Sequence, residues 1–262
     1  MRFWRMASVL CATGGLLAAQ VAGFDRNIYP GDEALPALRR TFRFAGFWLN
    51  APPGRPDNTW SGTRPALLRS GFGFLVLFNG RLEKELTAGA GALGRADGAA
   101  AAELTRKEGF PARTVIFLDQ EEGGRLVASQ RAYVHAWIDA VNVSGFRAGV
   151  YCSAVPFREG DGSVVNTADD LRRNAGSRQF ALFVYNDACP PAPGCALDRS
   201  LRPGASGISS AVAWQYAQSP RRKALTSTCA ATYAGSGACL DPGTQLDVDL
   251  STAISADPSH GR

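Results

Sequence analysis

Eight short apolar segments recur along this chain, and most are separated by segments with helical periodicity. The apolar segments span residues 21–25, 42–49, 72–78, 114–119, 146–152, 180–185, 211–216 and 245–249. Helical patterns cover residues 32–40, 63–70, 96–108, 126–143 and 167–174. Strands that alternate with helices in this way indicate a parallel sheet covered by helices. Eight of them favour a closed barrel over an open sheet, so we expect a single-domain α/β fold of the TIM (β/α)₈ type.

The chain has 262 residues, which is enough for one such barrel. Its first residues combine the charges of Arg2 and Arg5 with an apolar stretch over residues 6–19, which predicts a signal peptide over residues 1–22. We therefore expect a secreted or otherwise extracytoplasmic protein, with the barrel over residues 23–256 and a flexible tail over residues 257–262. No later segment is apolar enough to predict a transmembrane helix.

The charge of the chain is only weakly basic. The formal net charge of +5 falls to +3 when Arg2 and Arg5 leave with the predicted signal peptide. Nucleic-acid-binding proteins carry clustered Lys and Arg residues, so we expect no nucleic-acid partner here. The basic run Arg221-Arg222-Lys223 is interpreted as solvated loop charge. We expect a monomer.

The cysteines predict disulfides in the last third of the chain. Residues 187–210 and 217–244 are rich in Pro, Gly, Ser and Cys, which predicts two long loops. In an exported chain, local spacing suggests one disulfide inside each loop, Cys189–Cys195 and Cys229–Cys239. Cys152 is then expected to be a buried free thiol.

Three other chemistries are disfavoured. A zinc site is disfavoured because the chain has no paired C-x-x-C motifs and its only histidines are His135 and His260. The same scarcity of histidines argues against a serine-hydrolase triad. Residues 89–94 match G-x-G-x-x-G, but the polar segment 81–86 before them is not the strand that a dinucleotide site needs. We therefore expect no metal and no cofactor.

The segment 114–118 is apolar throughout and is followed at once by Asp119-Gln120-Glu121. A strand buried on both faces would deliver these acids at its carboxyl end, where the active sites of α/β barrels lie. Asp119 and Glu121 are two residues apart, so they would point to the same side of an extended chain. Repulsion and burial would raise the pKa of one carboxyl and leave the other charged, as glycoside hydrolysis requires. A solvated acidic loop, or a helix N-terminus where acids favour the positive end of the helix dipole, is the alternative.

Other predicted strands also end in acids or aromatic residues. If the barrel forms, these ends meet at one mouth, where carboxylates can act on a substrate and aromatic rings can pack on sugar faces. Ordinary packing is the alternative for the aromatic residues, and a helix N-cap is the alternative for Asp25. The side chains expected at the mouth are those of Asp25, Asp119, Glu121, Tyr151, Tyr185, Asp187, Trp214, Gln215, Tyr216, Asp247 and Asp249.

Several segments have the order and spacing of a known family. They are Gly23-Phe24-Asp25 and residues 44–49, 115–121, 145–151, 213–216 and 248–251, and they span nearly the whole chain after residue 22. On these segments the chain resembles the bacterial glycoside hydrolase-like domain once catalogued as domain of unknown function 1906, a relative of glycoside hydrolase family 25 muramidases. The resemblance implies a TIM-type barrel, export, and a cell-wall or other polysaccharide as substrate.

The resemblance also implies roles for four acids. Glu121 would be the general acid, and Asp119 would position the substrate or stabilise the positive charge that develops on it. Asp25 and Asp249 would line the same cleft, and the acetamido group of the substrate would be the nucleophile in a substrate-assisted reaction. The chain departs from muramidases at Asp25-Arg26-Asn27, where they commonly have a Ser-type motif.

Two functions are open at this point. The first is a secreted glycoside hydrolase that cleaves peptidoglycan or a related N-acetylhexosamine polysaccharide by carboxylate acid–base catalysis. The second is a non-catalytic carbohydrate-binding or wall-associated protein on a degenerate hydrolase barrel, since a fold does not fix a function. Cleavage of peptidoglycan by the protein, and its loss in Glu121→Gln, would separate them.

Overall fold

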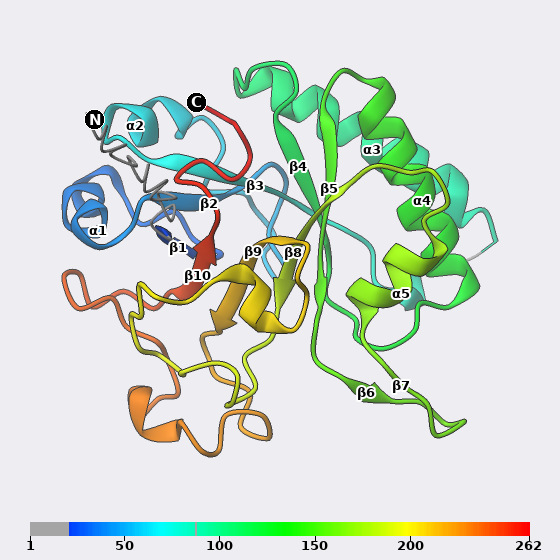
Figure 1. The fold of residues 1–262 in the computed structure, drawn as a ribbon. Helices are drawn as coiled ribbons and strands as arrows, with labels where there is room; N and C mark the ends of the chain where they lie inside the picture. The colour runs from blue at the N-terminus through cyan, green and yellow to red at the C-terminus, as the bar shows by residue number, and fades with distance from the viewer. Residues whose placement is uncertain (1–20, 87) are drawn as a thin grey trace, which may run out of the picture.

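Eight strands close into a barrel in the computed structural model, which describes residues 21–86 and 88–262 (Figure 1). In chain order they are β1 (Val21–Asp25), β2 (Phe44–Trp48), β3 (Gly73–Asn79), β4 (Val115–Gln120), β5 (Arg147–Ser153), β8 (Ala181–Tyr185), β9 (Ala211–Ala217) and β10 (Asp249–Ala253). The order around the barrel is β1-β10-β9-β8-β5-β4-β3-β2. The predicted single-domain α/β fold with a TIM-type barrel is confirmed.

The signal peptide predicted over residues 1–22 lies almost entirely outside the described residues. Of that segment the structure describes Val21 and Ala22, which begin β1 and pair with Ala253 and Thr252 of β10. These two residues are therefore part of the barrel wall. In the described residues, no helix combines the length and the apolar character needed to cross a membrane.

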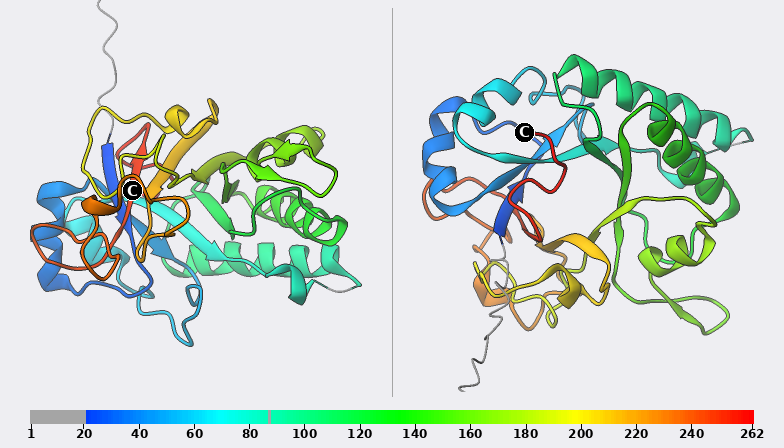
Figure 2. Two further views of the ribbon diagram at one scale, coloured as in Figure 1. Left: turned by 90° about the horizontal axis from the view of Figure 1, so that it is seen from below. Right: turned by 45° about the horizontal axis from the view of Figure 1, so that its top comes forward.

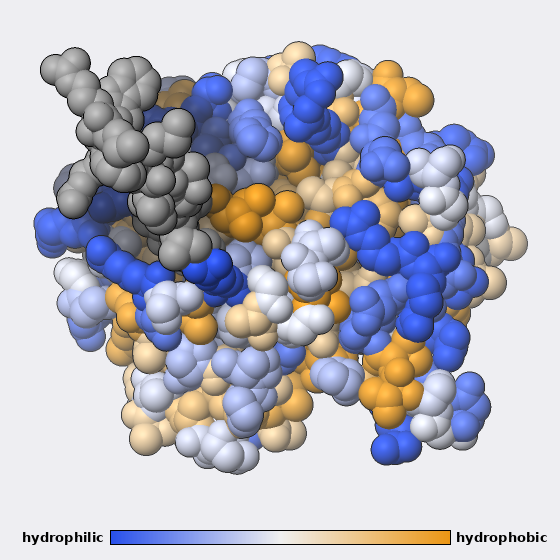
Figure 3. Space-filling view, viewed as in Figure 1, coloured by the Kyte–Doolittle hydropathy of each residue, from blue (hydrophilic) through white to orange (hydrophobic). Residues whose placement is uncertain are grey.

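Helices occupy the connections between the barrel strands. They are α1 (Leu35–Thr41), α2 (Arg64–Arg69), α3 (Ala90–Lys107), α4 (Ala128–Val143) and α5 (Thr167–Asn174), with short 3₁₀ helices η1 (Asp32–Ala34), η2 (Glu83–Glu85), η3 (Pro203–Ser206) and η4 (Ala230–Thr232). Helices α3 and α4 lie side by side on the outside of the barrel (Figure 2). The connection from β5 to α5 forms a hairpin of β6 (Phe157–Arg158) and β7 (Val164–Val165). Phe157 and Val164 are exposed, so the hairpin has an apolar surface (Figure 3).

Helix α3 begins at Ala90, earlier than the predicted start at residue 96. Its glycines permit a close approach to α4, because a Cβ on Gly94 would lie 2.2 Å from the carbonyl oxygen of Tyr133. The G-x-G-x-x-G motif therefore contributes to a helix–helix contact.

The last barrel strand differs from the prediction in position and direction. The sequence predicts a parallel strand over residues 245–249, whereas β10 starts at Asp249 and runs antiparallel to both β1 and β9. A parallel strand needs a connection that returns to the opposite end of the barrel. The connection from β9 to β10 contains no α-helix that returns, so the chain re-enters the barrel from the mouth.

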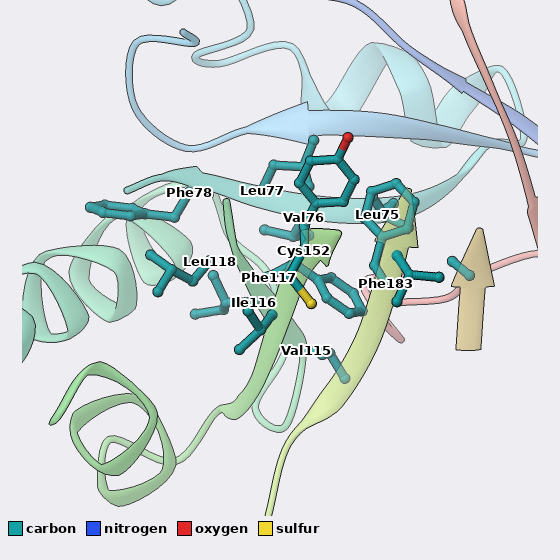
Figure 4. Packing of buried hydrophobic residues seen from close by; sticks show 14 of the residues in the cluster. Leu75, Val76, Leu77, Phe78, Val115, Ile116, Phe117, Leu118, Cys152 and Phe183 are labelled. Atoms are coloured by element: carbon teal, nitrogen blue, oxygen red, sulfur yellow. The ribbon is translucent and has the colours of Figure 1, made fainter. Parts of the chain in front are cut away.

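Apolar side chains fill the barrel and the layer beneath the helices. Strands β2 and β4 are buried along their whole length, which explains their continuous apolar sequences. Figure 4 shows side chains of β3 and β4 packed with Phe183 of β8, whose ring centroid lies 6.0 Å from that of Phe117. Cys152 lies in this core and forms no disulfide, as predicted.

The final residues pack against the barrel. The backbone N–H groups of Phe74 and Val76 in β3 donate to the side chains of Asp257 and Ser259 at 2.9 and 2.8 Å. The N–H of Val115 in β4 donates to the backbone oxygen of Ser259 at 2.8 Å. The segment 257–262, predicted to be a tail, therefore completes hydrogen bonds at the starts of two strands.

Two disulfides link the long loops to each other. They join Cys189 to Cys229 and Cys195 to Cys239, with Cα–Cα distances of 6.0 and 5.4 Å. The predicted pairs inside each loop are therefore wrong. The two loops lie together on one side of the barrel mouth (yellow to orange in Figure 1). The spacing of the cysteines within each loop does not show that the two loops meet.

Candidate active site

A cavity of about 280 Å³ lies where the parallel strands end and β10 begins. Asp25 lines it from the end of β1 and Asp249 from the start of β10. Asp119 lines it from β4, and Glu121 from the segment directly after that strand. The rest of the lining is Asn27, Trp48, Pro53, Leu77, Tyr151, Phe183, Tyr185, Gln215, Gln218, Ser219, Pro220 and Arg222. The four acids singled out in the sequence are thus brought to one cavity.

Gln215 of β9 connects two of these acids. Its Nε2 donates to Oδ1 and Oδ2 of Asp25 at 3.2 and 3.1 Å and to Oδ2 of Asp249 at 3.4 Å. Its Oε1 accepts from the hydroxyl of Tyr151 at 2.6 Å and from Nε2 of Gln218 at 2.9 Å. Because both ends of the amide are held, its N–H groups are fixed toward the carboxyl groups.

Two glycines make room for the acids. A Cβ on Gly46 of β2 would lie 2.3 Å from the Cβ of Asp25. A Cβ on Gly80, just after β3, would lie 2.6 Å from the backbone oxygen of Asp119. The positions of both acids therefore depend on a close backbone approach by the neighbouring strand.

The environment raises the pKa of each of the four acids, and burial is the largest cause each time. Burial raises the pKa of Asp25 to about 7, with repulsion by Glu121 adding to the rise. The pKa values of Asp119 and Asp249 lie well above their usual range, further raised by repulsion from Glu121 and Asp25, respectively. The pKa of Glu121 is raised by burial, and Arg222 opposes that rise. Near neutral pH the cavity therefore holds protonated as well as charged carboxyl groups.

Carboxylate clusters can also bind metal ions. Within residues 21–86 and 88–262, no three His, Cys, Asp or Glu side chains are grouped so that they could hold one. The arrangement offers carboxyl groups in different protonation states beside aromatic rings and amides.

Arg222 belongs to the cavity, so the expectation that it is solvated loop charge is wrong. Its Nε donates to Oδ2 of Asp187 at 3.0 Å, its Nη2 donates to Oδ1 of the same carboxylate, and its guanidinium lies 4.7 Å from the ring centroid of Tyr185. Tyr185 in turn donates its hydroxyl to the backbone oxygen of Glu121. The buried partner Asp187 is 35 residues away, so no local pattern marks this arginine.

Comparison with known proteins finds a glycoside hydrolase-like family that matches part of the chain. Residues 58–184 match the family described as Rv2525c-like, glycoside hydrolase-like domain. The resemblance predicted from the sequence is confirmed. No curated protein matches the chain.

Solved structures show the same fold. An uncharacterized B. stearothermophilus protein is 19% identical with a TM-score of 0.57, and the match covers 89% of this chain and 95% of that one. The Mycobacterium tuberculosis Tat-secreted protein Rv2525c is 13% identical with a TM-score of 0.54, over 93% and 98% of the two chains. The catalytic domain of endolysin ply40 from bacteriophage P40 of Listeria monocytogenes is 15% identical with a TM-score of 0.53, over 93% and 98%. At these identities the likeness establishes the fold.

The side chains expected to bind substrate divide into two groups. Tyr151, Tyr185 and Gln215 line the cavity, whereas Trp214 and Tyr216 do not. Side chains alternate along a strand, so when Gln215 points into the barrel its two neighbours point out. Both neighbours are buried, with ring centroids 5.8 Å apart. Trp214 and Tyr216 are therefore packed away from the cavity.

The mouth also contains a residue that the sequence analysis did not propose. Trp48 ends β2 and lines the cavity, and its place at a strand end is the same signal that identified Tyr185. Two acids expected at the mouth have other partners, since Asp187 pairs with Arg222 and Asp247 is exposed and pairs with Arg26 at 3.0 Å.

Proposed function

We propose that this protein is an exported glycoside hydrolase that cleaves peptidoglycan or a related N-acetylhexosamine polysaccharide. The observation that carries the proposal is the convergence of Asp25, Asp119, Glu121 and Asp249, all with raised pKa values, in one cavity at the barrel mouth. The glycoside hydrolase-like family match and the fold shared with an endolysin catalytic domain support it. Two disulfides and the fold shared with a Tat-secreted protein support export.

Glu121 is the general acid in this proposal. Burial raises its pKa, so its carboxyl group is protonated in a larger fraction of the molecules near neutral pH. That proton passes to the glycosidic oxygen while the bond between this oxygen and the anomeric carbon breaks. The carboxyl group of Asp25, which is partly charged near neutral pH because its pKa is about 7, stabilises the cation that develops on the sugar. Water then supplies a hydroxyl to the anomeric carbon and returns a proton to the enzyme.

The remaining lining residues position the sugar. Asp119, which lines the same cavity as Glu121, lies at the reacting bond in this proposal, and its raised pKa suits a hydrogen bond donated to substrate. Tyr151 and Tyr185, with ring centroids 5.5 Å apart, form an aromatic wall of the cavity, and Gln215 fixes the carboxyl groups of Asp25 and Asp249 beside it.

Release of reducing ends from purified peptidoglycan and from chitooligosaccharides tests the proposal. The wild-type protein should release them, and Glu121→Gln should lower the rate by about 10²–10⁴-fold because the proton donor is lost. Glu103→Gln is the matched control, since Glu103 is exposed on α3 and lines no part of the cavity. Its rate should equal that of the wild-type protein.

A non-catalytic carbohydrate-binding protein predicts a different result. In that case neither the wild-type protein nor Glu121→Gln would release reducing ends, while both would bind the polysaccharide in a pull-down assay. That outcome would replace the hydrolase proposal.

A further inference from the structure

A second cavity adjoins the first. It measures about 260 Å³ and is formed by the loops after β2 and β3 and by the end of β4. Pro53, Asp119 and Glu121 line both cavities. The acidic pair Asp119 and Glu121 therefore stands between two hollows of similar volume.

Each cavity has one arginine in its lining, and the two arginines are held in the same way. Arg81 lines the second cavity and donates from Nε and Nη2 to Oδ2 and Oδ1 of Asp97 at 2.7 and 3.0 Å. Arg222 lines the first and uses the same two nitrogens on Asp187. Among residues 21–86 and 88–262, Nη1 of neither arginine has a hydrogen-bond partner. A bidentate pair fixes the guanidinium plane, so the remaining edge is preorganised for a ligand.

The anchor of Arg81 reaches into the helical layer. Asp97 lies on α3, and its Oδ2 also accepts a hydrogen bond at 2.8 Å from the hydroxyl of Tyr133, which is buried on α4. The side chain of Arg81 is 37% exposed, whereas that of Asp97 is 15% exposed. The carboxylate of Asp97 is therefore hydrogen-bonded within the protein, and the guanidinium of Arg81 is accessible from the cavity.

Resting on the proposed function, we propose that the second cavity is a further sugar-binding subsite. A glycan chain occupies both cavities, with the bond to be cleaved beside Asp119 and Glu121. Arg81 donates a hydrogen bond from Nη1 to a carbonyl-type oxygen of the sugar in the second cavity. Two groups of a cell-wall glycan supply such an oxygen: the acetamido group, and the carboxylate of the lactyl ether on muramic acid. The protein therefore prefers a chain that continues on both sides of the bond.

Binding of oligosaccharides of two lengths tests this subsite. The full-length Glu121→Gln protein, which is expected to cleave about 10²–10⁴-fold more slowly than the wild type, is titrated by calorimetry with two sugars. They are a disaccharide and a tetrasaccharide of alternating N-acetylglucosamine and N-acetylmuramic acid. The tetrasaccharide should bind more tightly. Addition of Arg81→Ala should weaken the binding of the tetrasaccharide by at least about tenfold, as expected for a lost charge-assisted hydrogen bond. It should weaken the binding of the disaccharide much less. Equal weakening of both lengths would overturn the two-cavity arrangement.

Arg178→Ala in the same background is the matched control. Arg178 pairs with Asp139 through Nε and Nη2 at 3.1 and 2.9 Å, but it lines neither cavity. It should leave both dissociation constants unchanged. If Arg81→Ala behaves like Arg178→Ala while the wild-type protein still cleaves peptidoglycan, only the second subsite is overturned. If the wild-type protein cleaves nothing and the Glu121→Gln protein binds neither sugar, the proposed function fails and the subsite fails with it.

A tetrasaccharide of N-acetylglucosamine alone identifies the oxygen that Arg81 contacts. If Arg81→Ala weakens the binding of this ligand as much as the binding of the one that contains muramic acid, the acceptor is the acetamido oxygen. If only the muramic acid ligand is weakened, the acceptor is the lactyl carboxylate. Either result supports the subsite.

Discussion

Asp25 and Asp249 are register partners across the antiparallel pair of β1 and β10. Residues directly opposite each other in such a pair project to the same face, so the two carboxyl groups are neighbours. The side-chain nitrogen of Gln215, Nε2, donates hydrogen bonds to both of them. Repulsion by Asp25 adds to the effect of burial on the pKa of Asp249. The barrel is therefore closed, at its mouth, by two acids that cannot easily be charged together.

This pair predicts that the protein loses stability as the pH rises. The pKa of Asp25 is raised from 3.8 to about 7, so between these values the folded protein holds a proton that the unfolded chain has released. The free energy of unfolding should therefore fall from about pH 4 to about pH 7, with a contribution from Asp25 on the order of a few kcal/mol. Urea unfolding followed by circular dichroism across this range measures the slope, which should be smaller in Asp25→Asn.

Asp57→Asn is the control for this slope, because Asp57 is exposed in a loop away from the cavity. It should keep the pH dependence of the wild-type protein. An Asp25→Asn protein with an unchanged slope would show that Asp25 does not hold a proton in the folded state.

Gly46 is predicted to be essential for the position of Asp25. In Gly46→Ala the new methyl group would lie 2.3 Å from the Cβ of Asp25, so the carboxyl group or the strand must move. We expect a loss of about 1–3 kcal/mol in stability, as for other overpacked sites, together with a clear loss of reducing-end release. Gly160→Ala is the matched control, since nothing lies within 4 Å of a Cβ there. Full activity in Gly46→Ala would contradict the requirement for this close approach.

Local patterns in the sequence were sufficient for most of the barrel. The bounds of β1 and α5 agree with the predicted segments 21–25 and 167–174, because each is a single apolar or amphipathic stretch between clear breaks. The direction of β10 could not be predicted from such a stretch. Direction depends on the path of the preceding connection, and the segment before Asp249 has no helical pattern that shows where it runs.

The residues of the candidate site that could be predicted lie at or near the ends of strands. Asp25, Asp119 and Tyr185 reach the cavity in this way. Asp249 also reaches it, but as the first residue of an antiparallel strand, so the predicted location was right although the predicted strand was wrong. Arg222 could not be found, because its place depends on a loop folding back onto Asp187.

Arg222 is predicted to set the pH range of the reaction. It lowers the pKa of Glu121 against the effect of burial, so its removal should raise that pKa further. A double variant, Arg222→Gln with Asp187→Asn, avoids leaving Asp187 buried as an unpaired charge. If Glu121 is the proton donor, the alkaline limb of the kcat/KM profile should move to higher pH in this variant. A limb that stays in place would show that another group limits activity at alkaline pH.

The two disulfides are predicted to hold one wall of the cavity. Gln218, Ser219, Pro220 and Arg222 line it from the loop that Cys189–Cys229 and Cys195–Cys239 tie to the preceding loop. The bridges have sequence separations of 40 and 44 residues, for which loss of one bridge costs about 3–4 kcal/mol.

The variant Cys195→Ser with Cys239→Ser should therefore unfold at lower urea concentration and lose part of its activity. Mass spectrometry of a non-reduced digest of the wild-type protein should find peptides that join Cys189 to Cys229. Peptides that join Cys189 to Cys195 would instead mean that each loop is closed on itself. Arg222 would then lack the covalent tie, through Cys229, that holds its loop near Asp187 and Glu121.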